Sequence, residues 1–217
     1  MPQSYKYRIY STNIKLMYYL CHMDTKGHKI ILASGSPRRR ELLAGLDLEF
    51  EVDTRNNFEE IYDPATPQET IPQVLSEGKS LGFHRDLAAN ELLLTSDTLV
   101  LCEGRVMGKP SGKEEAIDMI KALSGRSHKV ITAVTLRDSS RMKTVSDTAL
   151  VHFKDLTDSE IEYYVDNYRP FDKAGAYGIQ EWIGYIGIDR IEGSYFTIMG
   201  LPVHKVYELL LEFIGQK

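Results

Sequence analysis

The amino-acid sequence predicts an α/β fold in which helices flank a mixed β-sheet. In the first half of the chain, strand-like apolar segments alternate with helix-like segments, a pattern typical of parallel crossovers. Near the middle, two long β-prone segments are joined by the short polar turn Asp138-Ser139-Ser140, which predicts an antiparallel hairpin. With 217 residues, 42% of them hydrophobic, the chain can form a sizeable core without disulfide or metal cross-links.

Apolar runs and alternating apolar residues predict the strands. In chain order these segments are 29–34, 48–52, 92–102, 127–137 and 142–153. The third is interrupted by the polar triplet Ser96-Asp97-Thr98. Towards the end of the chain, we expect one strand on each side of a turn at Glu192-Gly193.

Start signals and amphipathic spacing predict the helices. In chain order they cover 37–45, 66–84, 113–123, 157–167 and the residues after 202. The first has Pro37 at its first position and Ser36 as its N-cap. The second and fourth begin at capping boxes, which start with Thr66 and Thr157.

Of all parts of the chain, residues 1–22 have the sequence pattern least typical of a folded domain. They are tyrosine-rich and weakly basic, and they lack the continuous apolar stretch of a signal peptide. We interpret 1–22 as a non-native or disordered N-terminal extension and expect a single domain over 23–217. The two cysteines are too few for a disulfide framework, and no apolar run approaches the roughly 18 residues of a membrane span. These features favour a cytoplasmic protein without a membrane partner.

Charge is distributed unevenly along the chain. The net charge is −5, yet residues 1–40 hold eight Lys or Arg and a single Asp. The acidic remainder argues against nucleic acid as a partner, because broad nucleic-acid binding needs an extended basic surface. The pattern instead favours a small anion held in one local basic pocket.

The turn from Ser34 to Ser36 is the best candidate for that pocket. It leads from a strand into a helix whose first turn contains Arg38 and Arg39. Helix N-termini present unpaired N–H groups to anions, and arginine adds forked donors, so the segment suits phosphate. The alternative is a solvated basic turn, because cations oppose the helix dipole at this end. The GxxxxGK[ST] motif of P-loop enzymes is absent from the sequence.

Asp97 is the second informative position, and four further candidates are weak when each is taken alone. Asp97 interrupts an apolar strand, where a carboxylate is costly unless it is paired, binds metal or serves as a base. Lys79, Lys109, Glu60 and Gln180 could each contact a nucleotide or could equally be solvated surface side chains.

The sequence contains, in this order, the segments SGSPRRRELL, SDTLV, GKP, LSGRSHKVITAV, DKAGAYGIQ and IEGSYFTIMGLPV. Taken together, these six segments resemble the Maf family of nucleotide pyrophosphatases, and the resemblance runs from about Lys29 to the C-terminus. It implies an elongated, two-lobed mixed sheet with a central cleft, similar to the inosine triphosphate pyrophosphatases. It also implies hydrolysis of nucleoside triphosphates to the monophosphate and pyrophosphate with Mg²⁺ or Mn²⁺, and a possible homodimer.

The resemblance further implies roles for individual residues. Asp97 matches the proton acceptor and, with Glu60, the metal-binding carboxylates. The phosphate-binding positions fall on Ser34, Ser36, Arg38, Arg39, Lys79 and Lys109. The specificity positions fall on Arg38, Thr98 and Gln180.

The segment AGAYGIQ resembles the branch that acts on dTTP and UTP, rather than the branch that prefers 7-methyl-GTP. A glutamine amide can meet the O4 and N3–H edge of uracil or thymine. Two alternatives stay open at this point. One is a non-catalytic nucleotide-binding regulator of cell division, and the other is a pyrophosphatase for other or modified nucleotides.

Overall fold

The computed structural model describes residues 23–215, and the predicted extension at 1–22 lies outside the described residues. Its strands are β1 (Lys29–Leu32), β2 (Phe50–Val52), β3 (Glu91–Cys102), β4 (Arg105–Met107), β5 (Ser127–Arg137), β6 (Met142–Phe153) and β7 (Ile188–Glu192). Its helices are α2 (Pro37–Ala44), α3 (Ile71–Leu81), α4 (Lys113–Leu123), α5 (Asp158–Tyr168), α6 (Trp182–Gly187), α7 (Tyr195–Met199) and α8 (Val203–Ile214). Short 3₁₀ helices cover Gln68–Thr70 and Ala174–Ala176.

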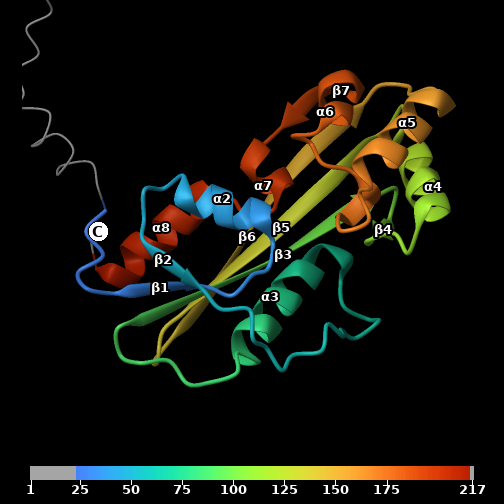
Figure 1. The fold of residues 1–217 in the computed structure, drawn as a ribbon. Helices are drawn as coiled ribbons and strands as arrows, with labels where there is room; N and C mark the ends of the chain where they lie inside the picture. The colour runs from blue at the N-terminus through green and yellow to red at the C-terminus, as the bar shows by residue number, and fades with distance from the viewer. Residues whose placement is uncertain (1–22, 216–217) are drawn as a thin grey trace, which may run out of the picture.

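Within 23–215 the strands form one mixed sheet in the order β2-β1-β3-β5-β6-β7, and β4 pairs with the end of β3 (Figure 1). Strand β1 runs parallel to both β2 and β3, whereas β5 is antiparallel to β3 and β6, and β7 is antiparallel to β6. The α/β class, the early parallel crossovers and the central hairpin are therefore confirmed. The hairpin pairs Arg137 with Met142 next to its turn.

The capping box predicted at Thr66 is wrong. Thr66 lies in a bend, where its N–H donates to the Asp63 carbonyl, and α3 begins only at Ile71. The acidic member of the predicted box, Glu69, instead accepts a hydrogen bond from Lys129 Nζ at 2.7 Å. The Glu69 side chain, which the local pattern assigned to the cap, thus forms a tertiary ion pair with Lys129. The capping box at Thr157 is confirmed.

The strand predicted after Gly193 is also wrong, because this segment forms the short helix α7. Thr197, on α7, is fully buried, and its carbonyl accepts a hydrogen bond from Thr132 on β5. Gly200 ends α7 in a left-handed conformation with φ of 102°. The β-prone composition of the segment is overridden by these contacts with the sheet.

Two hydrophobic cores lie towards opposite ends of the long strands (Figure 1). One packs α2 and α8 against Leu92 and Leu94 of β3, and the other packs α4 and α5 against Val100 of the same strand. We call the part of the molecule around the core with α2 and α8 the first lobe. The part around the core with α4 and α5, which also contains α6, is the second lobe. Between the cores, β3 carries the polar residues 95–98. The polar interruption seen in the sequence is therefore the boundary between two lobes.

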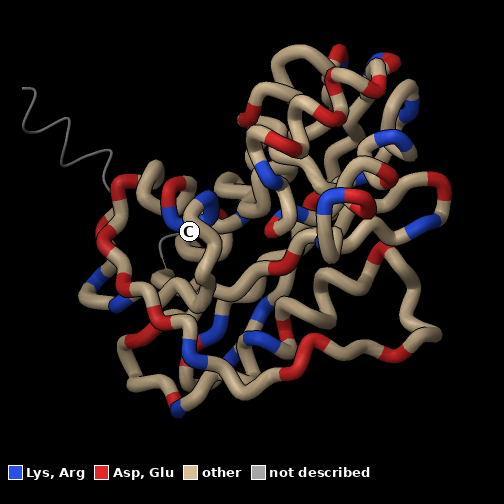
Figure 2. Tube along the Cα trace, turned by 45° about the vertical axis from the view of Figure 1, so that its right-hand side comes forward, with Lys and Arg blue, Asp and Glu red and all other residues tan. Residues whose placement is uncertain are grey.

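Acidic positions are spread over both lobes, and basic positions lie among them (Figure 2). No helix within 23–215 is long and apolar enough to cross a membrane. Cys102 is a free thiol buried in the core of the second lobe.

Candidate active site

A cleft opens at the polar boundary between the two lobes, and most of the predicted site residues line it. Those lining the cleft are Ser36, Arg38, Arg39, Lys79, Asp97, Thr98, Lys109 and Gln180. Ser34 and Glu60 are not among these lining residues, but Ser34 contacts Arg39 and Glu60 contacts Lys79. Residues that were scattered over the sequence therefore face one space.

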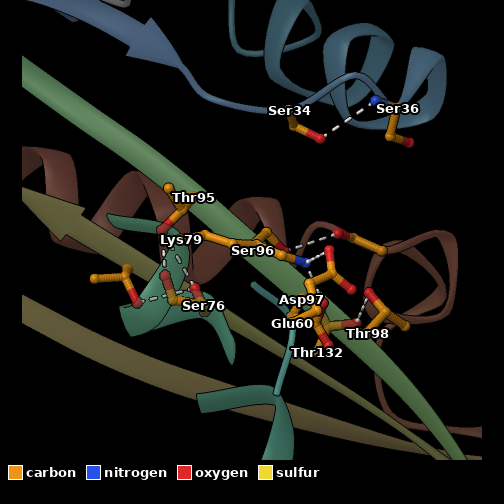
Figure 3. Close-up of polar contacts among 12 residues, drawn as sticks. Ser34, Ser36, Glu60, Ser76, Lys79, Thr95, Ser96, Asp97, Thr98 and Thr132 are labelled. Atoms are coloured by element: carbon orange, nitrogen blue, oxygen red, sulfur yellow. Dashed lines mark hydrogen bonds and ion pairs between the residues drawn. The ribbon is translucent and has the colours of Figure 1, made fainter. Parts of the chain in front are cut away.

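The turn between β1 and α2 is built by its two serines. Ser36 is the N-cap of α2, and its hydroxyl accepts from the Arg39 N–H at 3.5 Å. The Ser34 hydroxyl accepts from the Ser36 N–H at 3.3 Å (Figure 3). Pro37 at the first helical position favours the helical backbone from the start. The N-terminus of α2 consequently lies at the wall of the cleft.

Arg39 links this turn to the rest of the site. Its Nε donates to the Gly200 carbonyl at 2.8 Å, and its Nη1 donates to the Ser96 carbonyl at 2.8 Å. Its Nη2 donates to the Thr98 hydroxyl at 3.1 Å. Burial lowers the pKa of Arg39, although the nearby Asp97 carboxylate opposes that effect. The guanidinium therefore joins three segments in addition to adding positive charge.

Lys79 stands between two carboxylates at the centre of the cleft. Its Nζ lies 2.6 Å from Asp97 Oδ1 and 2.9 Å from Glu60 Oε1 (Figure 3). The Asp97 side chain is 13% exposed, while that of Glu60 is 55% exposed. Partial burial alone would raise the pKa of Glu60, but the Lys79 ammonium, helped by Lys109 and Arg39, holds it below its usual value.

Helix α3 holds Lys79 in place through buried hydroxyl groups. The Ser76 hydroxyl lies 2.9 Å from that of Thr135, and the Ser76 carbonyl accepts from the Thr95 hydroxyl at 2.8 Å. One turn further, Arg137 Nη2 donates to the Ser80 carbonyl at 2.7 Å. These contacts set the register of α3 on the sheet, and Lys79 lies between them.

The loop that carries Glu60 is docked on the same helix. The Phe58 ring occupies the space left by Gly78, where a Cβ atom would lie 2.2 Å from the ring Cζ. The Asn56 amide donates to the Lys79 carbonyl at 2.6 Å. Glycine at this helical position thus lets Phe58 sit close to α3 and brings Glu60 to the ammonium.

The opposite wall of the cleft contains residues that the sequence analysis did not assign. Arg38 Nη1 lies 3.2 Å from Asp172 Oδ2, and Asp172 Oδ1 lies 2.8 Å from Lys173 Nζ. The Lys173 side chain is only 8% exposed and also contacts Glu181 at 3.1 Å. The adjacent Asp172-Lys173 pair before a glycine-rich segment was the available signal, but its partners lie elsewhere in the sequence.

The carboxylates of the cleft fit a divalent cation that is shared with a phosphate ligand. Within 23–215, no group of three or more His, Cys, Asp or Glu residues is arranged to hold a metal ion. Mg²⁺, however, is commonly held by one or two carboxylates together with substrate phosphates and water. Asp97 and Glu60 supply two such carboxylates, because both contact the same ammonium group.

Comparisons with known proteins show which family the chain belongs to. The model of the "Maf-like protein" family matches residues 29–213. A dTTP/UTP pyrophosphatase of Christiangramia forsetii is 48% identical over 190 residues, which cover 88% of this chain and 96% of that protein. A dTTP/UTP pyrophosphatase of Porphyromonas gingivalis is 45% identical over 192 residues, with the same two coverages. A HAM1 protein of Coxiella burnetii aligns with a TM-score of 0.37 and 17% identity over 58% of this chain and 73% of that chain, too distant a likeness to support an argument.

Proposed function

The chain belongs to the Maf-like protein family, and we propose that it is a nucleoside triphosphate pyrophosphatase that hydrolyses dTTP and UTP to the monophosphate and pyrophosphate. The observation that carries the proposal is the placement of Lys79 between Asp97 and Glu60 in a cleft lined by further cations. The two relatives that bear this activity in their names each match 88% of this chain.

In the proposed complex, the triphosphate lies along the side of the cleft formed by α2 and α3. Arg38 on α2 and Lys79 on α3 line this side, and the N–H groups at the start of α2 add partial positive charge. Lys109 lines the cleft from the segment between β4 and α4. Arg39 adds charge but also uses donors on Ser96, Thr98 and Gly200. We therefore assign Arg39 a large part in holding the turn, beside its predicted contact with phosphate.

Asp97 is the proposed general base. It lies at the polar centre of β3, and one of its oxygens holds Lys79, so the other can take a proton from water. The water oxygen then bonds to the α-phosphorus while the bond from that phosphorus to the bridging oxygen of pyrophosphate breaks. Lys79 and Lys109 stabilise the negative charge that leaves with pyrophosphate.

We include a divalent cation, Mg²⁺ or Mn²⁺, in the proposal. Asp97 and Glu60 would hold it, and it would neutralise charge on the phosphate oxygens when bound. Glu60 is chosen over the adjacent Glu59 because the structure pairs Glu60 with Lys79. Glu59→Gln is therefore a matched control for Glu60→Gln in a titration of activity against Mg²⁺.

The test of the base is Asp97→Asn, which preserves size and removes the proton acceptor. We expect kcat to fall on the order of 10²–10⁴-fold while dTTP binding persists. Pyrophosphate release and equilibrium binding are the two measurements, and Asp118→Asn on α4 is the control. Near-normal turnover of Asp97→Asn would overturn the assignment. Binding of dTTP by the wild type without pyrophosphate release would instead favour the non-catalytic regulator, and faster turnover of modified nucleotides would favour a different substrate.

We also propose that the enzyme is cytoplasmic and can form a homodimer. Tyr185 on α6 and Phe196 on α7 are exposed and offer apolar surface to a second copy. Sedimentation of the full chain measures the oligomeric state directly, and a monomer at micromolar concentration would remove this part of the proposal.

A further inference from the structure

A buried tyrosine holds the turn that carries Gln180. The turn spans Gly178 to Glu181 and is closed by a hydrogen bond from the Glu181 N–H to the Gly178 carbonyl at 3.0 Å. Beneath it, the hydroxyl of Tyr164 accepts from the Gly178 N–H at 3.0 Å and donates to the Glu181 carboxylate. One hydroxyl group therefore binds both ends of the turn.

Tyr164 is suited to this role because it is itself fixed. Its side chain is completely buried on α5, and its ring stacks on that of Tyr168 with centroids 5.1 Å apart. Burial and the adjacent Glu181 carboxylate raise the pKa of Tyr164, so it remains a protonated donor at any physiological pH.

Gly178 brings the Gln180 side chain close to the turn. A Cβ atom at Gly178 would lie 2.8 Å from Glu181 Cδ and 3.1 Å from Gln180 Nε2. The Gln180 amide nitrogen therefore lies close to the backbone of residue 178, which the Tyr164 hydroxyl holds.

The same network reaches the other side of the cleft. Glu181 contacts Lys173, Lys173 contacts Asp172, and Asp172 contacts Arg38 on α2. Arg38, one predicted specificity position, thus lies at one end of a chain of ion pairs and hydrogen bonds, and the other end of that chain holds the turn that carries Gln180, another such position. That chain crosses from the second lobe to the first.

We propose that Tyr164 is a positioning residue for base selectivity: through Gly178 and Glu181 it fixes Gln180 so that the enzyme prefers uracil and thymine over cytosine. This inference rests on the proposed function. A free glutamine amide can turn by 180° and then match the cytosine edge, where the donor and acceptor are exchanged. Gln180 can therefore discriminate between these bases only while its orientation is restricted.

The test is Tyr164→Phe, which keeps the ring and removes both hydrogen bonds. Tyr168→Phe, on the same helix, is the matched control. For each variant, kcat/KM is measured with UTP and CTP, and with dTTP and dCTP, by pyrophosphate release. We expect kcat/KM for UTP relative to that for CTP to fall about tenfold in Tyr164→Phe, which is the size of one neutral hydrogen bond between Gln180 and the base. The same ratio should stay unchanged in Tyr168→Phe. In a Gln180→Ala background, Tyr164→Phe should produce no further loss of selectivity.

Selectivity retained by Tyr164→Phe, or an equal further loss in the Gln180→Ala background, would overturn the inference. If Tyr164→Phe does not fold, Glu181→Ala replaces it, because it removes the group that accepts the hydrogen bond from the Tyr164 hydroxyl, and the same two outcomes apply. The proposed function fails separately, by absence of dTTP and UTP hydrolysis in the wild type.

Discussion

Replacing Gly78 with alanine should reduce activity while leaving stability almost unchanged. Gly78 lies inside α3, and its missing Cβ makes room for the Phe58 ring. A Cβ placed there would approach the ring Cζ to 2.2 Å, so the ring must leave. Phe58 belongs to the loop that carries Glu60, and its displacement should withdraw that carboxylate from Lys79.

Two opposing effects determine the change in the free energy of unfolding. Alanine in a helix interior is favoured over glycine by about 1 kcal/mol. The half-buried Phe58 ring loses packing against Ile71, Leu75 and Leu99, which we set at about 1–2 kcal/mol. The net destabilisation should therefore be no more than about 1 kcal/mol. The activity has no such compensation, because Glu60 contacts Lys79 only while the loop is docked.

The assay compares Gly78→Ala with Glu60→Gln in dTTP hydrolysis at several Mg²⁺ concentrations, with urea unfolding of each variant. We expect kcat/KM to fall about tenfold in both, which corresponds to about 1.4 kcal/mol. Gly112→Ala is the control, since a Cβ atom there meets open space. Wild-type kcat/KM in Gly78→Ala, together with a clear loss in Glu60→Gln, would refute the role of Phe58 in placing Glu60.

Three further predictions follow from burial and packing. Gly184→Ala should destabilise the protein by about 3 kcal/mol in urea unfolding, because its Cβ would lie 1.8 Å from the Ile179 carbonyl oxygen, which belongs to the backbone and cannot swing away. Burial lowers the pKa of His128 from 6.5 to about 4, so the unfolded chain binds a proton that the folded chain resists, and stability falls as the pH drops below about 6.5. Between pH 7 and pH 5, protonation of this histidine in the unfolded chain should lower the free energy of unfolding by about 2 kcal/mol. Urea unfolding should show a smaller loss over this pH range in His128→Phe, and an unchanged pH dependence in that variant would contradict the assignment. Arg39→Lys keeps the charge but cannot form the fork to Ser96, Thr98 and Gly200, so we expect KM for dTTP to rise about tenfold, and an unchanged KM would show that charge alone suffices.

Several features of the fold could be predicted from the sequence because they depend on neighbours along the chain. The central hairpin, the helix at 113–123, the N-cap at Ser36 and the capping box at Thr157 are all present in the structure. The polar interruption of β3 was also visible, although its meaning as a boundary between two cores was not.

The two wrong predictions share one physical origin, which is contact between segments that are distant in the chain. At Thr66 the local pattern predicted a cap, but Lys129, far along the chain, binds the side chain that would have completed it. After Gly193 the β-prone residues form a helix because Thr197 is held against the sheet. Tertiary contacts of this kind outweigh local preferences of a few tenths of a kcal/mol per residue.

The sequence by itself determined which side chains were available: a basic turn, an acid within an apolar strand, and scattered lysines and amides. It did not determine that Lys79 would lie between Asp97 and Glu60, or that Tyr164 would hold the turn of Gln180. Those contacts join segments distant in the chain, and their distances depend on the register of the sheet and the docking of α3 and α5. Local propensity does not encode that docking, because it arises from packing between segments that meet only in the folded protein.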